Sequence, residues 1–329
     1  MGYLYVFEEM TPTNIRVSVV IPSYNDEPLI IPFYQAVKKA MDAWEGCDYE
    51  LIYVDDGSAD GSRETLAKLA MEDPKITYVE LWRNFGQQRA LFAGLRQSKG
   101  DFVVTIDGDY QYEPAAIRQL VEAMGTEGKC ELASGVRAQR MDGALDMLLS
   151  KVGHVIIRNI LGINVQDYGS VKCFSRKLVD RIVHLEHHYS DVYPTAFFLH
   201  PSFVETPVDH RPRTHGRSHW SFMMRFLLYL DMYIIHKNYF FVNVIKLAAA
   251  AAAASAAVGL ADMALILSSG PTDARLWGGA IAVGSFFSCV FAALWALSMS
   301  YILRLYKQNI IGAPYIVHRL FKDGRLSAE

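Results

Sequence analysis

The chain has 329 residues, of which 51% are hydrophobic and 20% charged, and its formal net charge is -3. This balance excludes the basic stripe that is typical of nucleic-acid-binding domains, and the hydrophobic fraction is high for a wholly soluble enzyme. The four cysteines lie far apart without the spacing of metal ligands, so we interpret them as isolated reduced thiols.

The N-terminal segment is acidic and lacks a long apolar run, so no signal peptide is predicted. Beyond it, four short apolar runs are typical of buried strands, and helix-forming stretches separate them. The strands are expected at 17–22, 51–54, 76–81 and 102–106, and the helices at 27–44 and 87–97. Strands that alternate with helices predict an α/β domain with a mostly parallel, helix-covered sheet.

After residue 167 the pattern becomes mixed, and further strands are expected at 170–175 and 203–208. The polar segment that follows is taken as the end of the catalytic domain, which then covers residues 1–218.

The C-terminal third is far more apolar. Residues 247–267 and 276–303 are each long enough to cross a bilayer, which takes about 20 apolar residues. The short linker at 268–275 makes them a two-span transmembrane hairpin within 241–305. Basic residues gather at its open end, so the positive-inside rule places the catalytic domain and a basic tail at 306–329 in the cytoplasm, with the protein integral to the inner or plasma membrane. A pair of buried helices in a soluble fold is the alternative.

Two more features concern the bilayer and assembly. Residues 219–240 are apolar nearly all round, and we interpret them as an amphipathic helix in the headgroup layer. In the second span, small residues recur at every fourth position from Ala280 to Ser300. This stripe suits close helix packing, either within the hairpin or between the subunits of a homo-oligomer, and both interpretations stay open.

Polar clusters follow three of the predicted strands, at 23–27, 55–58 and 107–111. Ligands bind at the carboxyl ends of the strands in such sheets, so these clusters predict the site. Asp107 and Asp109 would repel each other unless a cation lay beside them. Their hard oxygen atoms, separated by Gly108, suit Mg²⁺ or Mn²⁺ bridging a diphosphate, with Gln111 as support.

The other two clusters each admit two interpretations. The loop that begins at Asp55 either caps a helix or places this carboxylate to accept hydrogen bonds from a base or a ribose. The segment that begins at Pro22 either forms an ordinary turn or offers the ring of Tyr24 for stacking and carboxylates for ribose hydroxyls.

Four segments, in this order, resemble a known family: VSVVIPSYNDE, VDDGSADGS, RNFGQQRALFAGL and TIDGDYQYEP. The chain is similar to the family 2 inverting glycosyltransferases, which have the Rossmann-like GT-A fold. It is most similar to their polyprenyl-phosphate branch, which includes dolichol-phosphate mannosyltransferase and the bactoprenol glucosyltransferases. The resemblance covers roughly residues 16–220, and the two-span hairpin extends it to nearly the whole chain.

The resemblance implies roles for particular residues. The positions that line the nucleotide are Pro22, Tyr24, Asn25, Glu27 and Asp55. The positions at the metal and the diphosphate are Asp107, Asp109 and Gln111.

Two later segments also match the family. QDYGS at 166–170 resembles the second acidic motif and implies that Asp167 lies beside the sugar and the acceptor. RTHGRSHW at 213–220 resembles the loop that closes over the donor phosphates, and the positions concerned are Arg213 and Ser218. His219 stands where the family has lysine, so this loop lacks one permanent positive charge.

The acceptor raises a separate chemical question. A lipid phosphate is already anionic near neutral pH, so its oxygen needs cationic clamping more than it needs a base. The residues expected to hold it are Arg137, Arg140, Ser150 and Lys151. Relatives often carry a basic residue four positions before the serine, where this chain has Asp146. Asp167 is expected to orient the acceptor or the sugar, and only secondarily to act as a general base. The alternative is that Asp167 is a structural cap.

The expected function is transfer of a single sugar from a nucleotide-diphosphate sugar to a polyprenyl phosphate such as undecaprenyl phosphate, with inversion. A UDP-sugar is favoured over GDP-mannose. One alternative is a processive membrane polysaccharide synthase, which the absence of a QxxRW motif disfavours. Another is a non-catalytic membrane assembly protein with a decayed transferase domain, which the retained acidic residues disfavour.

Overall fold

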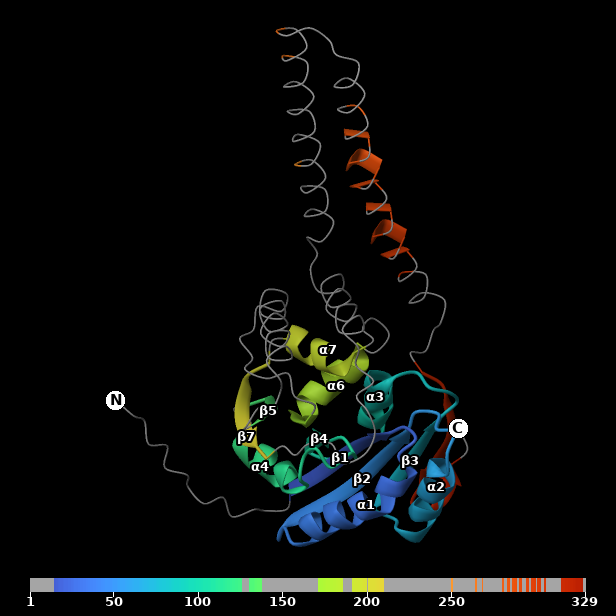
Figure 1. Ribbon diagram of the computed structural model, residues 1–329. Helices are drawn as coiled ribbons and strands as arrows, with labels where there is room; N and C mark the ends of the chain where they lie inside the picture. The colour runs from blue at the N-terminus through green and yellow to red at the C-terminus, as the bar shows by residue number, and fades with distance from the viewer. Residues whose placement is uncertain are drawn as a thin grey trace, which may run out of the picture. The chain divides into compact units, whose positions relative to one another are not determined.

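The computed structural model describes residues 15–125, 130–137, 171–185, 191–199, 201–209 and 315–327, with scattered residues between 250 and 305. The chain divides into two compact units. One comprises Met1–Arg225 together with Ala313–Glu329, and the other comprises Phe226–Gly312. The strands all belong to the first unit, which is described next (Figure 1).

Four parallel strands form the centre of the sheet, namely β1 (Ile15–Ser23), β2 (Cys47–Asp55), β3 (Ile76–Leu81) and β4 (Phe102–Thr105). The flanking strands are β5 (Leu132–Arg137), β6 (Lys172–Ser175), β7 (Phe203–Val208), β8 (Val317–Lys322) and β9 (Arg325–Ser327). Their order is β7-β5-β6-β4-β1-β2-β3-β8-β9. The α/β class and the parallel centre are confirmed. The sheet is more mixed than predicted, because β6 runs antiparallel to β4 and β8 runs antiparallel to β3.

Helices cover both faces of this sheet. They are α1 (Glu27–Asp42), α2 (Ser62–Glu72), α3 (Gln87–Gln97), α4 (Ala115–Ala123), α6 (Arg176–His184) and α7 (Val192–Phe198). Along β1, Val19 and Ile21 pack in a core cluster with Phe33 of α1. Val20 points to the other face, where Gly94 of α3 lies against it. Because both faces are covered, β1 is a continuous apolar run and not an alternating one.

The last two strands were missed by the sequence analysis, which placed them in a basic tail. β8 pairs with β3, and the ring of Phe321 stacks on Tyr78 with a centroid separation of 5.6 Å. The chain therefore returns to the sheet after the unit Phe226–Gly312 and extends it at the β3 edge.

The second unit, Phe226–Gly312, is described only at scattered helical residues. Among the described residues, none belongs to a helix with both the length and the apolar character needed to span a bilayer. The helix expected at 219–240 lies outside the described residues, as does most of the hairpin expected at 241–305. The packing of the small-residue stripe likewise stays a prediction.

The contact between α3 and β1 leads to a stability prediction. A Cβ atom added at Gly94 would lie 2.3 Å from Cγ1 of Val20, a stiff β-branched side chain. We expect Gly94→Ala to destabilise the fold by about 1–3 kcal/mol through overpacking, despite the better helix propensity of alanine. Thermal unfolding of the full chain would measure this. Adding Val20→Ala should restore part of the loss, and an unchanged midpoint in the single variant would contradict the packing described.

Candidate active site

The three polar clusters meet at one edge of the sheet, as predicted. Ser23 at the end of β1 is in register with Asp55 at the end of β2. On the other side of β1, the N–H of Ile106, just after β4, donates to the carbonyl of Val20 at 3.1 Å. The loops that leave these neighbouring strands therefore begin at the same edge of the sheet (Figure 1).

Side chains of the first loop hold the second loop in place. Asn25, in the left-handed conformation at φ 54°, donates its N–H to Ser58 Oγ at 2.9 Å and accepts from the N–H of Ala59 at 2.8 Å. The Glu27 carboxylate accepts from the N–H of Gly61 at 3.1 Å. These two residues were expected to line the nucleotide. The structure shows that they join the β1–α1 and β2–α2 loops, and a non-glycine residue at positive φ is typical of a constrained functional loop.

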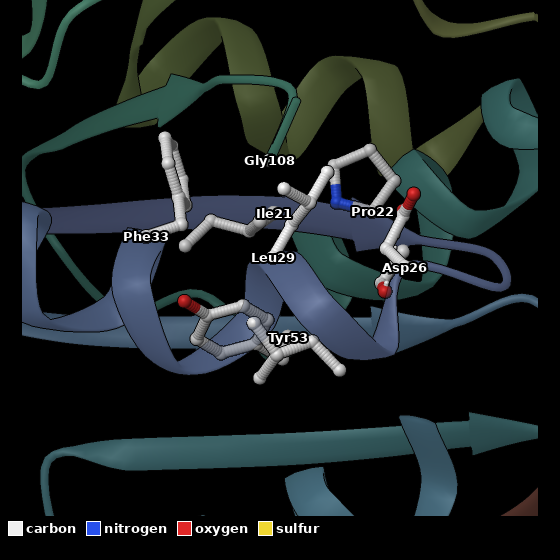
Figure 2. Close-up of a pocket in the computed structure, with 9 residues that line it drawn as sticks. Ile21, Pro22, Asp26, Leu29, Phe33, Tyr53 and Gly108 are labelled. Carbon is white, nitrogen blue, oxygen red and sulfur yellow. Dashed lines mark hydrogen bonds between the residues drawn. The ribbon is translucent and has the colours of Figure 1, made fainter. Parts of the chain in front are cut away.

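A small pocket lies where the first loop meets the DGD segment at 107–109. Pro22 and Asp26 lie at one end of it and Phe33 at the other, with Gly108 also in its lining (Figure 2). Tyr24, the residue after β1, is 43% exposed and is thus accessible to a ligand. The predicted nucleotide segment and the predicted metal segment are therefore neighbours in space.

Asp55 and Asp56 are both buried at the end of β2, but their partners differ. Asp55 accepts from the N–H of Ser58 at 3.1 Å and lies 3.5 Å from Nε of Arg63 on α2. The Asp56 carboxylate accepts from the N–H groups of Phe85 and Gly86, at 2.7 and 2.8 Å. Asp56 thus fixes the loop between β3 and α3.

That loop also approaches the glycine between Asp56 and Ser58. Gly57 has a φ of +73°, and a Cβ atom there would lie 2.3 Å from the backbone carbonyl carbon of Arg83. Both the backbone conformation and the lack of space therefore require glycine at this position.

The DGD segment is held by side-chain and backbone donors. Nε2 of Gln87, the first residue of α3, donates to Asp107 Oδ1 at 2.6 Å. The backbone N–H of Gln111 donates to Asp109 Oδ1 at 3.0 Å, so Gln111 acts on the metal segment at least through its backbone. Between them Tyr110 has a φ of 60° and packs edge-on against Phe33, with a centroid separation of 5.2 Å. Sequence reasoning missed Gln87, although the RNFGQQ motif places it at the start of a predicted helix, after the short loop that follows β3.

The donor set of this segment fits a divalent cation. Asp107 and Asp109 offer carboxylate oxygens two residues apart, the hard ligands that Mg²⁺ and Mn²⁺ prefer. Within the part of the chain that the structure describes, no group of three or more acidic, histidine or cysteine side chains forms a cage for a metal. One or two carboxylates completed by substrate phosphates is the usual arrangement for Mg²⁺.

A buried polar cluster lies beside the end of β4, and sequence reasoning missed it too. Lys172 is fully buried, donates from Nζ to Ser134 Oγ at 3.1 Å, and lies 4.8 Å from the centre of the Tyr193 ring. The Tyr193 hydroxyl is 3.2 Å from Oγ1 of Thr105, two residues before Asp107. A buried lysine is costly unless its amino group has partners, so the contacts with Ser134 and Tyr193 stabilise Lys172 in the interior.

The predicted acceptor residues are only partly described. Arg137 is the last residue of β5 and is paired in register with Val208 of β7. The remaining predicted site residues lie outside the described residues, namely Arg140, Ser150, Lys151, Asp167, Arg213 and Ser218.

Comparison with known proteins assigns the family. Residues 18–182, which contain most of β1, all of β2 to β4 and both acidic clusters, match the family model described as Glycosyl transferase family 2. The chain belongs to glycosyl transferase family 2. It is therefore a glycosyltransferase, and the resemblance inferred from its motifs is confirmed.

Curated relatives of this transferase carry a more specific name. An undecaprenyl-phosphate 4-deoxy-4-formamido-L-arabinose transferase of Aeromonas hydrophila is 33% identical over 68% of each chain. One of the same name from Pectobacterium carotovorum is 35% identical over 66% of each chain. Among solved structures, glucosyl-3-phosphoglycerate synthase from Mycobacterium tuberculosis superposes with a TM-score of 0.49 and 20% identity, over 68% of this chain and 80% of that chain.

The burial of Asp56 in the transferase leads to a pH prediction. Burial raises its pKa from 3.8 to about 6, against the lowering effect of the two N–H donors. A carboxyl group whose pKa is raised on folding stabilises the fold at low pH, and this contribution is lost as the pH rises through about 6. We expect the stability of the wild type, relative to Asp56→Asn, to fall by about 2 kcal/mol between pH 4 and pH 7.

Thermal unfolding of both proteins over this pH range would measure the difference. Because all other groups are common to the two proteins, their titrations cancel. A difference that does not vary with pH would show that Asp56 titrates at its ordinary value in the folded chain.

Proposed function

We propose that this transferase moves a single sugar from a nucleotide-diphosphate sugar to a polyprenyl phosphate such as undecaprenyl phosphate, with inversion at the sugar carbon. The observation that carries the proposal is its similarity, over two thirds of the chain, to relatives named as undecaprenyl-phosphate sugar transferases. The site supports it, because acidic and aromatic groups at one sheet edge suit a nucleotide diphosphate with its cation.

Mg²⁺ or Mn²⁺ would be held by Asp107 and Asp109 and would neutralise the charge of the departing nucleoside diphosphate. The protein's own part is to position these carboxylates. Gln87 and the backbone of Gln111 each donate to one carboxylate oxygen, so both side chains are oriented before a substrate arrives. Such preorganisation lowers the cost of reaching the transition state.

Donor recognition is proposed at the neighbouring loops. Tyr24 offers an exposed ring for stacking, and Pro22 lines the pocket beside Gly108. Asp55 would accept hydrogen bonds from the base, while Asn25 and Glu27 keep the two loops together. A UDP-sugar is proposed in preference to GDP-mannose on the resemblance to the bacterial glucosyltransferase branch.

For the acceptor, we propose that cationic groups clamp the lipid phosphate against the anionic donor. Arg137 is the last residue of β5, and β5 pairs with β6, the strand that carries the buried Lys172. The other proposed acceptor residues, Arg140, Ser150 and Lys151, come later in the sequence. An anionic phosphate oxygen is already a competent nucleophile, so Asp167 is assigned to orienting the acceptor or the sugar. Arg213 and Ser218 are assigned to closing over the donor phosphates.

We further propose that the enzyme is integral to the inner or plasma membrane, with the catalytic unit in the cytoplasm. The two apolar runs and the basic residues around them support this topology. Phe287, Phe291 and Trp295 recur every fourth residue in helical conformation, with exposed fractions of 44%, 72% and 61%. Large exposed apolar side chains along one helix face are typical of a surface that contacts lipid or another helix.

The test uses membranes that contain the full-length protein, undecaprenyl phosphate, Mg²⁺ or Mn²⁺, and a panel of radiolabelled nucleotide sugars. A monosaccharide on the lipid is the expected product. A polymer would indicate a processive synthase, and binding of nucleotide sugars without any product would indicate a non-catalytic protein.

Asp109→Asn tests the metal assignment. We expect transfer to fall by about 100-fold or more, because losing one carboxylate ligand removes several kcal/mol of charge stabilisation. Asp180→Asn is the matched control, since that carboxylate is 65% exposed on α6 and should leave transfer unchanged. Full activity in Asp109→Asn would refute the metal site.

A further inference from the structure

Two buried carboxylates face each other across β2 and β3. Asp55 and Glu80 are in register in the parallel pairing, and their side chains are 0% and 1% exposed. Two like charges in a dry environment disfavour each other's ionisation unless cations accompany them. Burial raises the pKa of Asp55, Glu80 adds to this effect, and Ser58 and Arg63 oppose it.

One guanidinium lies between these carboxylates. Arg63 of α2 places Nε 3.5 Å from Asp55 Oδ2 and Nη1 3.7 Å from Glu80 Oε1. Both distances are long for charge-assisted hydrogen bonds, which are usually 2.7–2.9 Å. A single shared cation therefore compensates two buried charges only weakly.

The second cation comes from the C-terminal strand. Arg319 of β8 places Nε 2.8 Å from Glu80 Oε2, and its Nη2 donates to Glu80 Oε1 at 3.2 Å. This is the bidentate geometry in which arginine binds a carboxylate most strongly. Tyr78 donates its hydroxyl to Glu80 Oε2 at 3.3 Å. The charge of Glu80 is thus compensated by Arg319 of β8, and Arg63 remains available to Asp55.

We propose that Arg319 is a positioning residue for the donor nucleotide: by neutralising Glu80 it leaves Arg63 to hold Asp55 as a charged hydrogen-bond acceptor. The inference rests on the proposed function, in which Asp55 accepts from the base. A base with a ring imide N–H, such as uracil or guanine, needs an acceptor at this point. A carboxyl group that has taken up a proton presents a donor there.

The titratable or charged groups that face the two carboxylates are Asp56, Arg63, Tyr78, His318 and Arg319, and Glu64 acts on Arg319. Burial and the nearby carboxylates raise the pKa of Tyr78, so it stays protonated. His318 Nε2 is 4.0 Å from Glu80 Oε1.

The experiment measures UDP and GDP binding to the full chain in detergent with Mn²⁺, from pH 7 to pH 9. In Arg319→Met the two carboxylates share one cation, so a proton is retained to higher pH. We expect the Kd of the better nucleotide to exceed the wild-type value most at pH 7, and the ratio of the two Kd values to fall towards one as the pH rises to 9.

Two further variants separate this effect from loss of structure. Arg325→Met removes the exposed basic residue of the adjacent strand β9 and should leave the pH profile unchanged. Adding Glu80→Gln to Arg319→Met removes the like charge and should restore tight binding at pH 7. If Arg319→Met fails to fold, Arg319→Lys, which keeps the charge but not the bidentate geometry, should show a smaller shift in the same direction.

The outcomes are distinguishable. Wild-type protein that binds neither nucleotide would overturn the proposed function. The inference alone would be overturned if the wild type binds a nucleotide and a folded Arg319→Met, or Arg319→Lys, shows the same pH profile of nucleotide binding as the wild type. A weaker Kd that does not vary with pH would also overturn it, because loss of shape does not depend on a proton.

Discussion

Negative charge gathered at the carboxyl edge of a parallel sheet is the constraint on which the rest of this structure depends. Asp55 ends β2 and Asp56 follows it, and both are buried, whereas Asp107 and Asp109 follow β4 and are half-buried. Carboxylates withdrawn from water are tolerated only with donors or cations beside them. Asp56 meets this need with two backbone N–H groups, Asp55 with Ser58 and Arg63, and Asp107 with Gln87. The same contacts fix the loops, so satisfying the charges also builds the site.

The elements of the fold that could be predicted from the sequence are those set by local sequence patterns. β1 to β4 are short apolar runs, each closed by polar or turn-forming residues, and their burial follows from that pattern alone. β8 carries two basic residues and leaves only Leu320 and Phe321 buried, so its sequence resembles a tail. It is a strand because β3 offers it an edge and Glu80 offers its arginine a partner, 239 residues away in sequence. No local pattern contains that information.

The site divides in the same way. Strand ends followed by acidic residues predicted that the polar clusters meet at one edge of the sheet, and the strand register confirms this, because the position of a loop follows from the order of strands and helices. The hydrogen-bond partners of individual side chains could not be predicted from that order. Asn25 and Glu27 have the chemistry to contact a ribose, yet each accepts a backbone N–H from the β2–α2 loop, a role that becomes visible only when both loops are placed. Gln87 and Lys172 were missed because their partners lie on other elements.

The return of the chain to the sheet has a consequence for how the catalytic unit is delimited. The unit comprises Met1–Arg225 and Ala313–Glu329, so a cut after residue 225 removes β8 as well as the apolar segment. That cut would expose the hydrogen-bonding edge of β3 and take Arg319 from Glu80, whose side chain is 1% exposed. Glu80 would then keep only the distant Arg63 and the Tyr78 hydroxyl as partners, and a buried carboxylate that loses its closest cation destabilises the fold. The apolar segment is therefore an insertion between two parts of one sheet, and the sheet requires both parts.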